Sequence, residues 1–130
     1  MAHGSDALVI RGGVARDVDV VARKIQQAID RGDGAVLSVY IDSRQEGESH
    51  DAAVARISRE ADIRYGSIQV STLGRLQQAG FRVELDVLDD EPPSHHHVHF
   101  EVPVSDSQVH AFISCFDEPV PNPGRGTNDK

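Results

Sequence analysis

Four of the seven histidines fall within five positions, in the segment that runs from Ser94 to Pro103. Successive side chains of a β-strand point to opposite faces, so residues two apart share a face. If the segment is a strand, one face carries three imidazoles and a carboxylate: His95, His97, His99 and Glu101. The other face would pack on the core through apolar side chains: Val98, Phe100, Val102 and Val104.

This histidine row has the composition of a metal site. Same-face residues lie about 6.5–7 Å apart along a strand, so two imidazoles can converge on one ion. A carboxylate of the row, or Glu84 or Asp86 of the preceding strand, can complete the set. Such ligands predict a divalent transition metal, Zn, Fe or Mn, that activates a water molecule. The alternative is a solvated sheet face, where a cross-strand His–carboxylate pair contributes only about 0.2–1 kcal/mol.

The charge of the chain favours proteins rather than nucleic acids as partners. Its 130 residues include 21 Asp and Glu against 13 Lys and Arg, for a formal net charge of −8. Phosphate contacts need basic side chains, so we do not expect this acidic protein to bind nucleic acids. The acidic residues before the histidines are the predicted contact for a basic partner: Glu84, Asp86, Asp89, Asp90 and Glu91.

Cysteine content and hydropathy bear on the compartment. Cys115 is the only cysteine and lies among apolar residues, which predicts a buried side chain rather than a nucleophile. No apolar run approaches the roughly 20 residues that span a bilayer, and the N-terminus lacks a signal-peptide pattern. We therefore expect a cytoplasmic protein without membrane contact.

The first third of the chain has a strand–helix–strand pattern. Residues 7–10 form a short apolar run, and apolar residues then recur at helical spacing from Val18 to Ile29 after a cap at Asp17. Residues 35–41 are rich in β-branched types and predict a second strand. Because a helix between two strands usually forms a crossover, we expect the two strands to be parallel.

The remaining elements are less regular. A helix should begin at His50 or Asp51, and a later helix should end at Gly80, but residues 65–71 are ambiguous, so the sequence does not decide whether 51–79 form one helix or two. Residues 81–88 alternate as a strand that should pair antiparallel with the histidine strand. Residues 105–116 predict a final helix. The Pro, Gly and Asn content of 117–130 predicts a disordered tail.

These elements predict an α+β fold. We expect a two-layer sandwich of one domain, residues 1–116, in which helices pack on one face of a mixed sheet. The element order is similar to ferredoxin-like topologies, a likeness of layout that carries no function.

Three further motifs have structural explanations. Arg11-Gly12-Gly13 lies between a strand and a helix and could offer backbone N–H groups to an anion, although Asp17 and Asp19 oppose this. His50-Asp51 is explained by helix capping. The basic residues of the second helix alternate with Glu60 and Asp62, which predicts a charged helical face: Arg56, Arg59 and Arg64.

No complete catalytic set is present, which favours a binding protein over an enzyme. The leading hypothesis is a small acidic protein that inhibits a basic partner, as antitoxins and immunity proteins do. The first alternative is a metal-dependent enzyme that uses the histidine row. The second is an assembly subunit whose open sheet face pairs with a second copy, with pH-dependent association because histidine titrates near 6.5.

Overall fold

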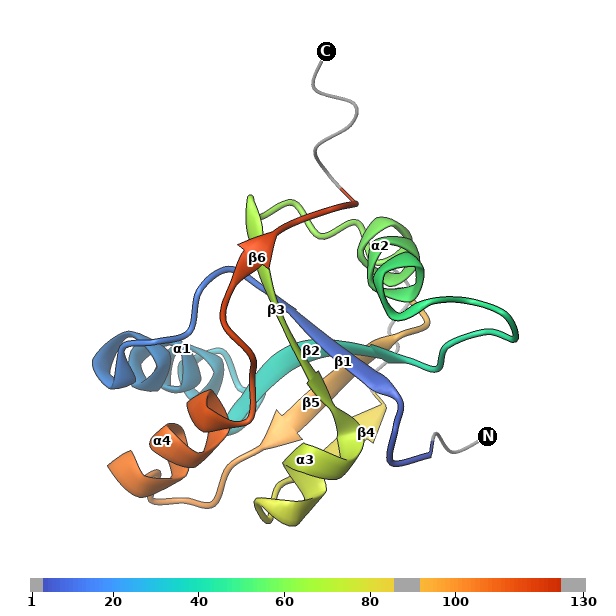
Figure 1. Ribbon diagram of the computed structural model, residues 1–130. Coiled ribbons are helices and arrows are strands. Elements are labelled where there is room, and N and C mark those ends of the chain that lie inside the picture. The colour runs from blue at the N-terminus through green and yellow to red at the C-terminus, as the bar shows by residue number, and fades with distance from the viewer. Residues whose placement is uncertain (1–3, 86–91, 125–130) are drawn as a thin grey trace.

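The computed structural model describes residues 4–85 and 92–124, which form one sheet with helices on both faces (Figure 1). In chain order the elements are β1 (Leu8–Gly12), α1 (Val18–Asp30), β2 (Val36–Asp42), α2 (His50–Glu60), β3 (Ser67–Thr72), α3 (Leu73–Gln78), β4 (Arg82–Leu85), β5 (His95–His99), α4 (Asp106–Ser114) and β6 (Val120–Pro121). The predicted α+β class is confirmed.

The sheet is antiparallel at every strand pair that the described residues form, rather than mixed. Its order is β4-β5-β2-β1-β3-β6. The predicted parallel pairing of β1 with β2 is wrong, because Ile10 lies opposite Tyr40 and Leu8 opposite Asp42. The connection through α1 leaves and re-enters the sheet at the same end, so it is not a crossover. This order also differs from the ferredoxin-like layout, in which crossovers join parallel strands.

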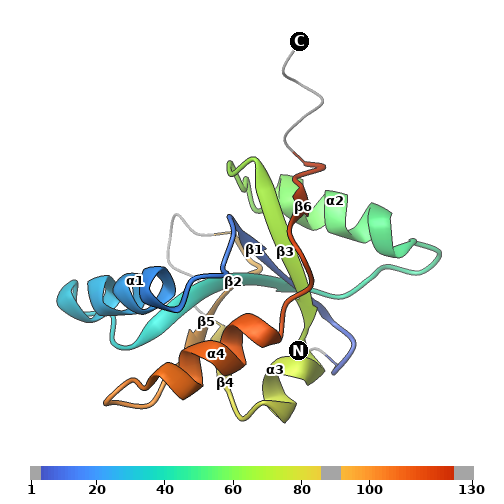
Figure 2. The same cartoon turned by 60° about the vertical axis from the view of Figure 1, so that its left-hand side comes forward.

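Two apolar cores lie on opposite faces of the sheet. Alternate side chains of the strands, such as Val9, Val39 and Val98, face one side of the sheet and pack under α1, α3 and α4. Residues of the other parity, such as Leu8 and Ile10, pack under α2, so helices cover both faces rather than the one expected. Figures 1 and 2 show α2 over the β1–β3 half of the sheet, away from α1 and α4.

The helix starts follow the sequence. The side chains of Asp17, Ser49 and Ser105 accept hydrogen bonds from backbone N–H groups in the first turns of α1, α2 and α4. Each bond satisfies a donor that the helix leaves unpaired. Most of the ambiguous segment 65–71 belongs to β3, so α2 and α3 are separate helices with a strand between them.

The structure differs from the expected tail at residues 117–124. Val120 and Pro121 pair with β3 as an edge strand. The buried amide of Asn122 donates to the carbonyls of Ile63 and Tyr65 at 2.8 and 2.9 Å. Composition alone misleads here because one amide side chain ties a polar segment to the domain. Residues 125–130 lie outside the described residues.

Candidate functional site

β5 places the histidine row on the α2 face of the sheet, as the alternation predicts. His97 lies opposite Ser38 of β2 and Glu84 of β4. The ring centroids of His95 and His97 are 5.2 Å apart, and those of His97 and His99 are 6.5 Å apart, both edge to face. Two imidazoles of the row have hydrogen-bond partners on the neighbouring strands: His95 Nε2 lies 3.0 Å from Ser38 Oγ and His99 Nε2 lies 2.8 Å from Glu84 Oε1.

The row does not converge on a metal position. Within residues 4–85 and 92–124, no group of three or more His, Cys, Asp or Glu side chains is arranged to hold an ion. Glu101 lies beyond the end of β5, where its backbone N–H donates to Gln108 Oε1 of α4 at 2.7 Å. The metal hypothesis for His95, His97, His99 and Glu101 therefore gains no support from the geometry.

The predicted acidic contact is described at one residue only. Glu84 accepts from His99 and pairs with Arg82 at 3.2 Å, and these contacts, the His99 hydrogen bond foremost, lower the pKa of its carboxyl. Asp86, Asp89, Asp90 and Glu91 lie outside the described residues. Leu85, the last described residue of β4, is 60% exposed on this edge strand.

A different feature marks the centre of the sheet, where β1 and β2 separate. The two strands pair only through Leu8–Ile10 of β1, whereas β1 stays paired with β3 as far as Gly12. Residues 36–38 of β2 remain paired with β5. The sheet therefore splits into a β6-β3-β1 half and a β2-β5-β4 half. A cavity of about 300 Å³ occupies this opening, which we call the split pocket.

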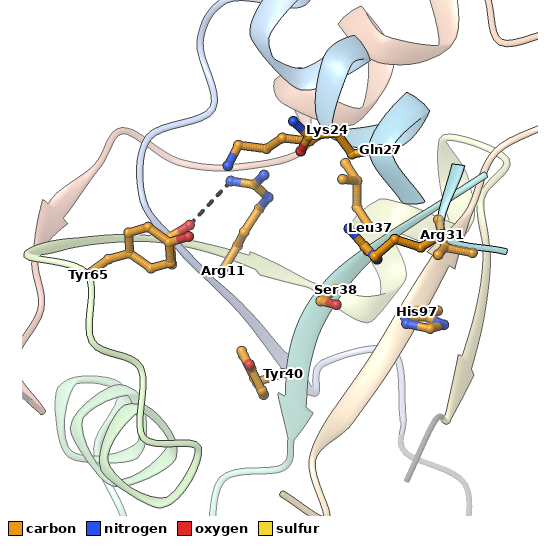
Figure 3. A pocket seen from close by; sticks show the side chains of 11 residues that line it. Arg11, Lys24, Gln27, Arg31, Leu37, Ser38, Tyr40, Tyr65 and His97 are labelled. Carbon is orange, nitrogen blue, oxygen red and sulfur yellow. Dashed lines mark hydrogen bonds between the residues drawn. The ribbon is translucent and has the colours of Figure 1, made fainter. Parts of the chain in front are cut away.

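The split pocket has a basic lining. It draws on the end of β1, one side of α1, the start of β2, and single residues after α2 and in β5: Arg11, Gly12, Lys24, Gln27, Arg31, Val36, Leu37, Ser38, Tyr40, Tyr65 and His97. Figure 3 shows Lys24 and Arg11 directed toward the same space, with the Tyr65 ring beside them and His97 at the far end. Among the residues that the structure describes, no Asp or Glu lines this cavity.

Arg11 is the most unusual residue of the pocket. It is 7% exposed, and its Nε has no hydrogen-bond partner. Its guanidinium donates to the carbonyl of Gly12 at 3.3 Å and lies 5.9 Å from the centre of the Phe112 ring. Burial lowers the pKa of Arg11 from its usual value, and the nearby Tyr65 acts in the opposite direction. Arginine nevertheless keeps its charge in proteins, so this is a buried cation without a carboxylate partner in the described residues.

Gly12 and Gly13 let Tyr65 form a wall of the pocket. A Cβ at Gly12 would lie 2.4 Å from Tyr65 Cδ2 and 3.0 Å from Ile63 Cγ2, so only glycine permits this approach. Gly13 has a φ of +88° and its N–H donates to the carbonyl of Ser67 at 2.8 Å. The pair of glycines thus fixes the ring against the backbone at the end of β1.

The structure changes the interpretation of Arg11-Gly12-Gly13. An anion bound by the motif itself would lie at the start of α1, but there the Asp17 carboxylate already accepts from the N–H groups of Asp19 and Val20, in line with the opposition expected from Asp17. The basic site is instead the split pocket, which the side chain of Arg11 lines at the end of β1. The sequence does contain a signal for this site that the sequence analysis missed. Arg11 is a charged residue next to the end of an otherwise apolar strand, Leu8–Gly12.

The other candidates have structural roles. Ser49, next to His50-Asp51, caps α2, and a second cavity of about 380 Å³ near His50 is lined by apolar residues with acidic ones at Asp51, Asp117 and Glu118. Cys115 is buried, its Sγ lies 3.2 Å from the carbonyl of Ala111, and burial raises the pKa of its thiol. These features agree with capping and core packing.

The chain matches no protein-family model, no curated protein and no solved structure. None of the helices in the described residues is long and apolar enough to cross a membrane.

Proposed function

We propose that this protein binds a small anion in the split pocket. The observation that carries the proposal is the buried guanidinium of Arg11, which has an unpartnered Nε and no carboxylate within the described residues to neutralise it. A buried charge is strongly unfavourable unless it is paired. An anionic ligand would supply the missing partner.

A second cation supports the same conclusion. Lys24 lines the pocket from α1, and its amine is directed toward the guanidinium of Arg11 (Figure 3). Two like charges that share a small space repel each other, and an anion between them converts repulsion into attraction. The protein carries a net charge of −8, so a basic pocket here is a local exception to its overall charge.

The proposed function is that of a binding protein, the class that the sequence favours, but the partner is a small anion instead of a basic protein. The basic-partner hypothesis depends on the acidic residues from Glu84 to Glu91, most of which lie outside the described residues. The metal-enzyme and self-assembly hypotheses depend on the histidine row, where no metal-binding group of three forms within the described residues. All three stay hypotheses, and the split pocket has the more specific geometry.

The test is calorimetric titration of the protein with inorganic phosphate, sulfate and citrate at low ionic strength. We expect saturable one-site binding of at least one of these anions. Arg11→Met and Lys24→Gln should each weaken that binding tenfold or more. Arg23→Gln removes the same charge from the exposed face of α1 outside the pocket and should leave the affinity within twofold.

Lys24 is exposed, so its substitution should not disturb folding and keeps the test valid if Arg11→Met is unstable. Equal affinities for Lys24→Gln and Arg23→Gln would mean that binding follows net charge alone. That result, or no saturable binding of any of the three anions, would refute the proposal.

A further inference from the structure

The lining of the split pocket also indicates which anion it takes. Resting on the proposed function, we propose that the ligand is a phosphomonoester. Its phosphoryl group would lie between Arg11 and Lys24, and its organic part would extend along β2 toward Ser38, Tyr40 and His97.

The charge of the pocket fits a dianion. Three basic side chains line it, but Arg31 already donates to Asp33 at 3.1 Å. Arg11 and Lys24 make no ion pair within the described residues, which leaves two positive charges for the ligand. A phosphomonoester carries about −1.5 to −2 near neutral pH, with a second pKa of about 6. A carboxylate or a sulfate ester carries only one negative charge and would leave one cation uncompensated.

The donors also fit a phosphoryl group. Arginine presents a planar fork of N–H groups that suits two oxygens at once, and lysine adds a compact point charge from another direction. Tyr65 lies beside this pair of cations, held in place by its contact with Gly12 (Figure 3). Groups fixed before binding lose little conformational entropy when the ligand arrives.

The volume of the pocket exceeds what a phosphate needs. At about 300 Å³ it lies at the lower end of cavities that hold small organic ligands. The part away from Arg11 is bounded by hydroxyls and rings: Ser38 Oγ lies 3.0 Å from His95 Nε2, and the Tyr40 ring lies 5.6 Å from that of His95. A polar organic group, such as a sugar, finds hydrogen-bonding partners along this wall.

The organic part is tested by titration with ribose 5-phosphate, inorganic phosphate and ribose. We expect ribose 5-phosphate to bind at least tenfold more tightly than inorganic phosphate, and ribose not to bind measurably. The double substitution Ser38→Ala with Tyr40→Phe should bring the affinity for ribose 5-phosphate close to that for inorganic phosphate.

The charge match is tested with phenyl phosphate and phenyl sulfate at pH 8, which have the same shape but differ by one charge. We expect phenyl phosphate to bind at least tenfold more tightly, and Lys24→Gln to reduce that ratio to threefold or less. Arg23→Gln is the matched control and should preserve the ratio.

The outcomes separate this inference from the proposed function. If ribose 5-phosphate binds no better than inorganic phosphate, or phenyl sulfate binds as well as phenyl phosphate, the phosphomonoester inference fails while anion binding stands. If no anion binds at all, the proposed function fails and this inference fails with it.

Discussion

Two arginines of this protein, Arg11 and the half-buried Arg56, have opposite surroundings. The side chain of Arg56, on α2, is 12% exposed and bonds both oxygens of Glu48 at 2.8 and 3.0 Å, Asp42 at 3.0 Å and Glu60 at 3.3 Å. Its guanidinium also donates to the carbonyl of Ser43 at 2.9 Å. Arg11, at the end of β1, has a single backbone acceptor and no carboxylate in the described part of the chain.

The difference separates an arginine whose ion pairs stabilise the fold, Arg56, from one for which we propose an anionic ligand, Arg11. Arg56 fastens the loop between β2 and α2, and the Glu48 hydrogen bonds raise its pKa further above the ordinary value. Every direction from its guanidinium is already satisfied, so it cannot take a ligand without losing a partner. Arg11 keeps donors without acceptors inside a cavity, which is the arrangement of a binding residue.

The largest effect on stability is expected at Arg56. Arg56→Met should lower the free energy of unfolding by more than the other substitutions below, because it leaves the Glu48 and Asp42 carboxylates without their common partner. Urea denaturation at pH 7 measures the change. Arg64→Met is the control, since Arg64 pairs only with Asp62 on the exposed surface, and it should leave the midpoint unchanged. A midpoint for Arg56→Met equal to the wild type would remove the contrast between the two arginines.

The next effect is expected at Gly12, which gives the split pocket its shape. Gly12→Ala should lower the free energy of unfolding by about 1–2 kcal/mol, because its Cβ would overlap the Tyr65 ring. In a Tyr65→Ala background the same substitution should lower it by clearly less, a coupling that a double-mutant cycle in urea measures. Strictly additive effects would show that Tyr65 does not rest on this glycine.

A smaller effect on stability is expected at Arg11. Without ligand, Arg11→Met should change the free energy of unfolding by less than about 1 kcal/mol or raise it, because it removes a buried charge that lacks a partner. Thermal unfolding in phosphate-free buffer gives the comparison with Arg56→Met. If Arg11→Met is destabilised as strongly as Arg56→Met, Arg11 is a structural residue as well.

The effect expected at Glu48 depends on pH: it is present at neutral pH and shrinks in acid. The Arg56 hydrogen bonds lower the pKa of Glu48 from 4.5 to about 2 in the folded protein. Its contribution to stability is therefore present above pH 4.5 and is lost as the pH falls toward 2. Denaturation from pH 6 to 2 should show a shallower acid loss for Glu48→Gln than for the wild type. Glu46→Gln, in the same loop, should follow the wild-type curve.

Local patterns in the sequence predicted most of the elements. Asp17 and the residues His50-Asp51 marked two helix starts. The alternation of residues 81–88 and of the histidine segment predicted two antiparallel strands, and the register of β4 with β5 confirms their pairing. The same patterns failed where one distant contact decides the outcome. Asn122 holds a polar segment that composition assigned to a tail, and the hydrogen bonds of Glu101 with Gln108 end β5 before the carboxylate joins the histidine row.

The sequence by itself determined which faces of the strands and helices are apolar, because side-chain periodicity is local. It placed three histidines on one face and Arg11 beside Gly12 and Gly13. Only the tertiary structure decided that β2 runs antiparallel to β1 and separates from it after Ile10, since strand direction and register depend on contacts between distant segments. Because the two strands separate, Arg11 and Lys24, which are 13 positions apart in the chain, line the same pocket.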